Sequence, residues 1–288
     1  MTAEVPARAR AGGRGPDAER RRDGQQSPLV WDVLSRVIAE RSAMTGRAAL
    51  DIVDVGAGTG GFAVSMARRG HRVTVVDPSP DALAAARWRA AEAGITLTEV
   101  QGEAVDLPAL VGQPGAGGGS SAGADLVICH NVLEYVDSPS DALSAVAHVL
   151  RPGGTVSVLA ANSVAAVLQR ALAGKYLEAR ALLPGAGGPA PSAAPEPASA
   201  APEPGSAAAP RRFTLPELTA LLEAAGLRPG AAHGIRIFAS LLPGAAADPA
   251  AAEALRELEE AAASCPPLRD IATRLHVLGH HPAHPPEQ

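Results

Sequence analysis

The sequence predicts an α/β fold in which helices cover both faces of a mostly parallel sheet. Seven short apolar runs are typical of strands, and segments with helical spacing of apolar residues lie between most of them. The first strand breaks into the glycine-rich stretch "DVGAGTGG" and then enters a helix. Apolar strands that alternate with helices indicate a sheet buried on both sides, and right-handed crossovers make it a doubly wound, Rossmann-like sheet.

Each element follows from its pattern. Strands are expected at 50–55 ("LDIVDV"), 72–77, 95–100, 124–130 ("ADLVICH"), 154–160, 234–240 ("GIRIFAS") and 274–280 ("RLHVLGH"). Helices are expected at 27–41, 61–70, 79–94, 138–154, 214–226 and about 248–263. The strand count therefore predicts seven strands in one sheet.

The chain divides by composition. Residues 1–27 hold almost no large apolar side chains and are expected to be a disordered tail. Residues 184–210 are rich in Pro, Ala and Gly and are expected to be a disordered linker insertion. We expect 28–183 and 211–281 to form one domain, because strands continue after the linker, and 282–288 to form a second tail.

Composition also restricts the function. The 288 residues include 47% hydrophobic but only 2% aromatic residues, so Ala, Val and Leu must build the core. The formal net charge of -5 argues against a fold that binds nucleic acid by overall basicity. Cys129 and Cys265 suggest no disulfide framework. Without a membrane-length apolar run or a secretory signal, a cytoplasmic protein with no membrane partner is expected.

The glycine turn predicts a nucleotide-like ligand. Gly56, Gly58 and Gly60 allow the backbone to turn tightly and to approach a ligand at a helix N-terminus. Asp77 ends the second strand about 20 residues later, where a carboxylate can accept both hydroxyls of an adenosine ribose. The alternative for Asp77 is a simple helix cap. This much fits NAD and S-adenosylmethionine equally.

Further residues separate the two cofactors. Asp54 lies two residues before the glycines, and Glu103 and Ala104 follow the third strand where an adenine edge would lie in a methyl-donor site. Together, "VDVGAGTG", "VTVVDPS", "ADLVICHNVLEYV" and "LRPGGTVSVL" resemble the class I S-adenosylmethionine-dependent methyltransferases. That resemblance covers roughly residues 31–159 and implies the seven-stranded class I methyltransferase fold.

A narrower resemblance reaches further along the chain. "HNVLEYVDSP", "AGKY", "GIRIF" and "LRDIATRLHVLGHHP" are similar to the bacterial tRNA 5-carboxymethoxyuridine methyltransferase family, which methylates the carboxylate of a modified wobble uridine. The chain departs from that family at Gln26, where the family has an arginine, and in the neutral linker, where the family has a basic stretch. The methyl acceptor, tRNA or a small molecule, therefore stays open.

The resemblance implies a set of site residues. Contacts with S-adenosylmethionine are expected from Asp54, Gly56, Ala57, Gly58, Gly60, Asp77, Glu103, Ala104 and His130. Candidates for orienting a carboxylate acceptor are Tyr176, Arg212 and Arg236, because a carboxylate needs a cation or donors rather than a general base. His130 is expected to contact the cofactor or to be structural rather than to act as a base. No catalytic residue is assigned.

Three function classes remain. The first is a methyltransferase for an oxygen or carboxylate, with tRNA as a candidate partner. The second is a small-molecule O- or N-methyltransferase on the same scaffold. The third is an NAD-dependent oxidoreductase. No metal is expected, because His276, His280, His281 and His284 lack a Cys or carboxylate partner and are interpreted as a solvated tail. The oligomeric state is left open.

Overall fold

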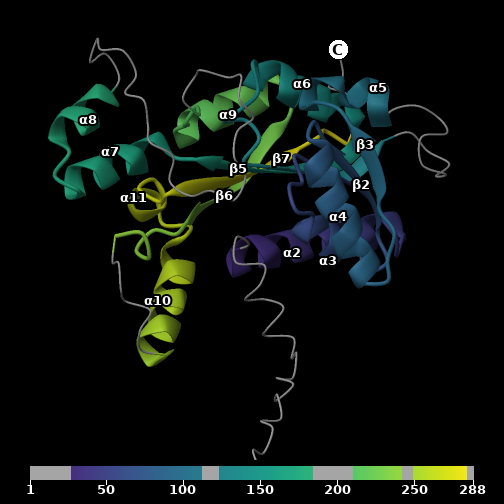
Figure 1. Cartoon of the computed structure of the whole chain (residues 1–288), viewed down its shortest axis with the longest axis horizontal. Coiled ribbons are helices and arrows are strands. Elements are labelled where there is room, and N and C mark those ends of the chain that lie inside the picture. Colours follow the sequence, from purple (N-terminus) through teal and green to yellow (C-terminus); the bar gives the residue numbers. More distant parts are fainter. Residues whose placement is uncertain (1–26, 112–122, 184–209, 242–248, 284–288) are drawn as a thin grey trace, which may run out of the picture.

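The computed structural model describes residues 27–111, 123–183, 210–241 and 249–283 (Figure 1). The expected tails at 1–27 and 282–288 and the expected linker at 184–210 lie almost wholly outside the described residues, so they stay predictions. Strands from before and after the linker region join one sheet. This is the arrangement that the one-domain hypothesis requires.

Among the described residues, one sheet holds seven strands in the order β3-β2-β1-β4-β5-β7-β6. They are β1 (Asp51–Val55), β2 (Arg72–Asp77), β3 (Thr98–Gln101), β4 (Ala124–His130), β5 (Leu150–Ala161), β6 (Arg228–Ile235) and β7 (Arg274–His280). All pairs from β3 to β5 are parallel, and β7 is antiparallel to both β5 and β6. The order reverses between β1 and β4, and ligands of doubly wound sheets bind at the carboxyl ends of strands at such a point.

Helices cover both faces of this sheet (Figure 1). One face packs against α2 (Pro28–Thr45), α3 (Gly61–Ala67) and α4 (Pro80–Glu92). The other packs against η1 (Ala104–Asp106), α5 (Leu107–Val111), α6 (Pro139–Val149) and α9 (Leu215–Ala224). The remaining helices are α7 (Ser163–Leu172), α8 (Tyr176–Ala181), α10 (Pro249–Ala262) and α11 (Pro266–Arg269).

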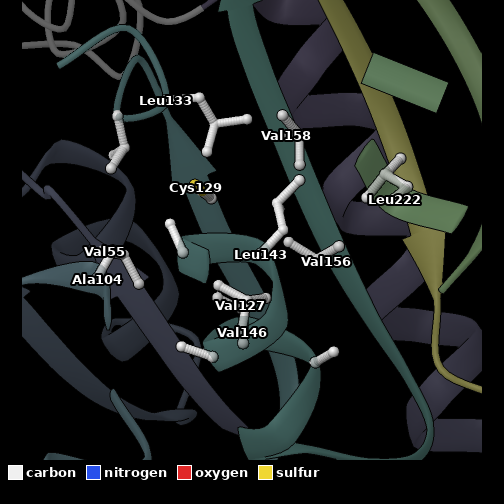
Figure 2. Packing of buried hydrophobic residues seen from close by; sticks show 14 of the residues in the cluster. Val55, Ala104, Val127, Cys129, Leu133, Leu143, Val146, Val156, Val158 and Leu222 are labelled. Atoms are coloured by element: carbon white, nitrogen blue, oxygen red, sulfur yellow. The ribbon is translucent and has the colours of Figure 1, made fainter. Parts of the chain in front are cut away.

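Strand β4 shows how the sequence fills both layers. All seven of its residues are buried, as expected for a central parallel strand. Val127 and Cys129 point toward Leu143 and Val146 of α6 (Figure 2), whereas the alternate residues belong to the cluster under α2. Burial raises the pKa of the Cys129 thiol to about 12, so Cys129 is a protonated core residue and no nucleophile.

An ionic cluster ties the amino ends of these strands together. The side chain of Asp125 is fully buried and accepts hydrogen bonds from Arg41 Nε at 3.2 Å, Arg47 Nη1 at 2.9 Å and Arg151 Nη1 at 2.8 Å. It also accepts the backbone N–H of Asp51 at 3.0 Å. The cluster links α2, β1, β4 and β5 at the sheet edge opposite the glycine turn.

The structure corrects three expectations near the end of the chain. The strand expected at 234–240 is β6 at Arg228–Ile235, because Arg236 adopts a left-handed φ of 59° and ends it. Its residues were overlooked because an outer strand is only half covered and lacks a continuous apolar run. The β5 strand begins at Leu150 rather than at 154. The solvated-tail interpretation is wrong for His276, which is fully buried in β7, and for His280, which is partly buried.

Candidate functional site

The turn after β1 requires glycine for two separate reasons. Gly56, Gly58 and Gly60 have φ values of 63°, 51° and 72°, in the left-handed region that favours glycine. A Cβ at Gly56 would lie 2.6 Å from Cγ2 of Val132, so the turn also packs against the chain that follows β4. The backbone N–H of Gly56 donates to the carbonyl oxygen of Val76 at 2.8 Å, which holds the turn beside the end of β2.

Asp77 lies directly beside this turn. Its carboxylate is 7% exposed and accepts hydrogen bonds from the backbone N–H of Gly58 at 3.2 Å and of Ser79 at 2.9 Å. The cap of α4 is Ser79, whose hydroxyl accepts the N–H of Ala82. Asp77 is therefore not the cap of α4. Its carboxylate keeps lone pairs that the hydrogen bonds from Gly58 and Ser79 do not use.

The space in front of Gly58 is open. A Cβ built there would meet no heavy atom of the described residues within 4 Å, although its backbone N–H is held by Asp77. A glycine with left-handed φ and an unfilled Cβ position leaves room for a ligand to touch the main chain. The turn thus combines a carboxylate with an approachable backbone.

Asp54 lies beneath the turn and differs from Asp77 in its surroundings. It is 4% exposed, and burial raises the pKa of its carboxyl to about 7, while a hydrogen bond from the backbone of Ala63 opposes the rise and the charge of Asp77 adds to it. Since Ala63 belongs to α3, Asp54 joins β1 to the first turn of that helix. This contact on both sides of the glycine turn indicates that Asp54 stabilises the turn.

The segment after β3 reaches the same edge of the sheet. The N–H of Gly102 donates to the carbonyl oxygen of Asp77 at 3.3 Å. Glu103 is exposed and caps η1 in a reciprocal capping box with Asp106. Ala104 is buried in the core cluster that also contains Val55 and Val132. Glu103 and Ala104 therefore lie next to the ends of β1, β2 and β4, and their contact with a cofactor stays a prediction.

His130 is the last residue of β4 and is 8% exposed. Its Nε2 lies 2.8 Å from Oγ of Ser157, and its Nδ1 is buried without a hydrogen-bond partner among the described residues. Burial lowers the pKa of His130 to about 3, and the nearby Arg274 adds to this. The imidazole is therefore neutral at pH 7 and is unsuited to being a strong general base.

Beyond His130, two arginines act electrostatically on one buried carboxyl group. Glu134 is 5% exposed; its Oε1 accepts the N–H of Ala161 at 2.8 Å, and its Oε2 has no partner among the described residues. Burial raises the pKa of Glu134, and the charges of Arg274 and Arg212 oppose that rise. Arg212 is an exposed residue, but partial burial of its guanidinium lowers its pKa, and repulsion by Arg170 and Arg274 lowers it further.

The three predicted acceptor residues are not brought together equally. Arg212 is the one that interacts with Glu134 and Arg274 at the ends of β4 and β7. Tyr176 lies on α8 and is 71% exposed, and Arg236 is exposed after the outer strand β6. Sequence reasoning missed Glu134, Arg274 and Ser157; the signal was a polar residue within or just after a buried strand.

The residues present fit S-adenosylmethionine. The Asp77 carboxylate suits a ribose diol, the open face at Gly58 suits close approach of a ligand to the backbone, and the buried Nδ1 of His130 is an unsatisfied polar atom at the same edge. The sheet also differs from the six-stranded order 3-2-1-4-5-6 of NAD-binding Rossmann domains, because antiparallel β7 lies between β5 and β6.

Comparison with known proteins agrees with this geometry. The profile of a family described as "Methyltransferase domain" matches residues 53–156. The tRNA 5-carboxymethoxyuridine methyltransferase of Escherichia coli K12 is 30% identical over 158 residues, which are 54% of this chain and 56% of that protein. The ubiquinone biosynthesis O-methyltransferase of Xanthomonas euvesicatoria is 33% identical over 162 residues, 56% of this chain and 63% of that protein. The chain thus matches little more than half of each curated relative.

Solved structures show the same fold. A chain from the complex of the Haloferax volcanii methyltransferase activator Trm112 with a methyltransferase has a TM-score of 0.53 and 18% identity, with 94% of this chain and 97% of that chain covered. Magnesium protoporphyrin IX methyltransferase from Synechocystis, solved with bound S-adenosylhomocysteine, has a TM-score of 0.51 and 14% identity, with 94% and 89% covered.

Residues 53–156 thus match a methyltransferase domain, and the seven-stranded sheet has the fold of solved methyltransferases. Within this chain, that domain includes the matched residues 53–156 and the β-strands that complete the sheet after them. In the parts of the chain that the structure describes, no group of three or more His, Cys, Asp or Glu side chains could hold a metal ion. None of the described helices has both the length and the apolarity needed to cross a bilayer.

Proposed function

We propose that this chain transfers the methyl group of S-adenosylmethionine to a carboxylate or another anionic oxygen acceptor. The observation that supports the acceptor class is the pair Arg212 and Arg274 beside Glu134, next to His130. Two guanidinium groups against one buried carboxyl leave positive charge at the edge of the donor site. Within the described residues, neither guanidinium has a hydrogen-bond or ion-pair partner, so both are available to an anion.

The site explains how such a transfer would be assisted. When bound, S-adenosylmethionine supplies an already activated methyl group, so the protein contributes alignment and exclusion of water. Asp77, the backbone at Gly56–Gly58 and Glu103–Ala104 would hold this donor. Arg212 and Arg274 would orient a carboxylate, which is nucleophilic without loss of a proton. This agrees with a His130 that is neutral and weakly basic.

Among acceptors, we propose the carboxylate of a modified uridine in tRNA. The identity to the E. coli tRNA 5-carboxymethoxyuridine methyltransferase supports it, as do Arg212 and Arg274 near Glu134. The second candidate is a small-molecule O-methyltransferase, which the identity to the ubiquinone biosynthesis enzyme favours. A phenolic hydroxyl, unlike a carboxylate, would have to lose a proton, and His130 offers little basicity for that step.

Two experiments test the proposal. Calorimetric titration with S-adenosylhomocysteine and with NAD tests the donor, and binding of NAD alone would overturn the donor assignment. For the acceptor, the purified protein is incubated with methyl-labelled S-adenosylmethionine and bulk tRNA from its own host. We expect base-labile label in tRNA, since methyl esters hydrolyse in alkali, and much less label with the variant Arg274→Gln. Label that enters only small phenols would favour the second candidate.

A further inference from the structure

A row of histidine side chains crosses one face of the sheet. In the strand register, His130 of β4 is opposite Leu159 of β5, Leu159 is opposite His276 of β7, and His276 is opposite His233 of β6. The four residues therefore lie in line on the face covered by α2 and α3. The row begins at the donor edge and ends at the outer strand.

Ser157 connects two of these histidines. Its hydroxyl is fully buried and lies 2.8 Å from Nε2 of His130 and 2.7 Å from Nε2 of His276. The Nδ1 atoms of both rings are buried without partners among the described residues. His233 stacks on His276 with ring centroids 5.7 Å apart, but it takes no part in the Ser157 hydrogen bonds.

The number of available protons allows only two hydrogen-bond arrangements among His130, Ser157 and His276. The hydroxyl of Ser157 has one proton to donate, and among the described residues its Oγ has no hydrogen-bond partner besides the two imidazoles. The buried hydroxyl therefore donates to one imidazole and accepts from the other. If His130 carries its proton on Nε2, then His276 must carry its proton on Nδ1, and the reverse holds if His130 is protonated on Nδ1. Burial lowers the pKa of both rings, so neither becomes doubly protonated near pH 7.

The hydrogen-bonded side chains of His276, Ser157 and His130 extend to the glycine turn. The His130 ring contacts Phe62 edge to face, with centroids 5.0 Å apart, and Phe62 is the second residue of α3, just after the turn. The orientation of His130 is thus fixed by Phe62 on one side and Ser157 on the other. A substitution at His276, two strands away in the sheet, would therefore affect the His130 ring through the hydroxyl of Ser157.

We propose that Ser157 and His276 are positioning residues for His130, holding it in one orientation at the methyl-donor site and coupling its tautomer to that of His276. The inference rests on the proposed donor site, because a fixed His130 matters for function only if a ligand binds there. It predicts that His130 and His276 always have opposite tautomers. A purely structural pair of hydrogen bonds would not need to affect donor affinity.

Nitrogen-15 NMR on histidine-labelled protein tests the tautomers, with assignments from single-histidine variants. We expect one of the two rings to be protonated at Nε2 and the other at Nδ1. In Ser157→Ala, the tautomer of His130 should no longer depend on that of His276, and the dissociation constant for S-adenosylhomocysteine should rise about tenfold, the effect of one lost hydrogen bond. His276→Phe should have the same effect on affinity.

Two variants serve as controls. His276→Gln keeps a side chain that can donate or accept, so it should restore affinity to within a factor of about three of wild type. His233→Phe keeps the stacked ring without touching Ser157, so it should leave both tautomers and affinity unchanged. Equal tautomers at His130 and His276 in the wild type would overturn the proposal, as would unchanged affinity in both Ser157→Ala and His276→Phe.

The outcomes that refute the proposed function differ from those that refute the positioning role. If the wild-type chain does not bind S-adenosylhomocysteine, the donor site itself is refuted, and with it the positioning role, whatever the tautomers are. If the wild type binds S-adenosylhomocysteine and the tautomers are equal, the donor site is retained and only the positioning role of Ser157 and His276 is refuted. If Ser157→Ala does not fold, His276→Phe and His276→Gln carry the comparison.

Discussion

The carboxylate of Asp77 accepts a hydrogen bond from the backbone N–H of Gly58 at 3.2 Å, which joins the end of β2 to the turn after β1. These two residues are 19 positions apart in the sequence but adjacent strands bring them together. The pair places a buried carboxylate beside an approachable main chain.

Replacing Asp77 should weaken the donor site. We expect Asp77→Ala to reduce the binding free energy of S-adenosylhomocysteine by about 1–3 kcal/mol, because a charged acceptor is lost. Asp77→Asn, which retains one acceptor oxygen, should lose less. Calorimetric titration measures both. Asp81→Ala, an exposed acidic residue in the first turn of α4, is the control. Unchanged affinity in Asp77→Ala would mean that this carboxylate only supports the turn.

Gly58→Ala should separate binding from folding. Its φ of 51° makes alanine cost about 1 kcal/mol of stability, but no protein atom obstructs the new methyl group. Gly46, after α2, has a φ of 66° and equally open surroundings, so Gly46→Ala is a matched control far from the turn. Urea unfolding should show similar losses for both. Only Gly58→Ala should lose S-adenosylhomocysteine affinity, by at least about tenfold; equal affinities would contradict a ligand at Gly58.

Asp54 should make stability fall as pH rises. The folded chain keeps the Asp54 proton up to a pKa of about 7, whereas the unfolded chain releases it near the ordinary aspartate pKa of 3.8. Its contribution is therefore complete below pH 4 and is lost as pH rises through 7. Asp54→Asn, which cannot ionise, should match the wild type at pH 4 and exceed it by about 2–4 kcal/mol at pH 8. Urea unfolding at both pH values measures this, and no gain at pH 8 would refute it.

Asp125 should matter for stability alone. Asp125→Ala leaves the guanidinium groups of Arg41, Arg47 and Arg151 without their shared buried partner. Removing one member of a buried ion pair typically costs about 3–5 kcal/mol of unfolding free energy. S-adenosylhomocysteine affinity should be unchanged, because the cluster lies at the opposite edge of the sheet. Asp141→Ala on the surface of α6 is the control, and a loss below about 1 kcal/mol for Asp125→Ala would contradict the prediction.

Much of the fold was accessible from local pattern. Strand β4 was predicted at its observed bounds, because a strand buried on both faces reads as a continuous apolar run. Strand β6 was misplaced, because an outer strand needs no such run, and its end depends on the backbone of Arg236. The strand order, with β7 between β5 and β6, follows from pairing between distant segments, and the sequence analysis did not predict it.

The sequence by itself determined the class of site. The glycines after β1, Asp77 after β2 and His130 after β4 are all close to strand ends that the local pattern marks, and parallel strands bring such ends to one edge. Their roles as donor contacts stay predictions. Only the tertiary structure decided which polar residues meet across the sheet. Ser157 and His276 are 119 positions apart, and the charge of Arg274 acts on Glu134 only because β7 turns back antiparallel beside β5. Local propensity indicates where a strand forms. Which side chains become neighbours depends on the register between strands, and long-range packing fixes that register.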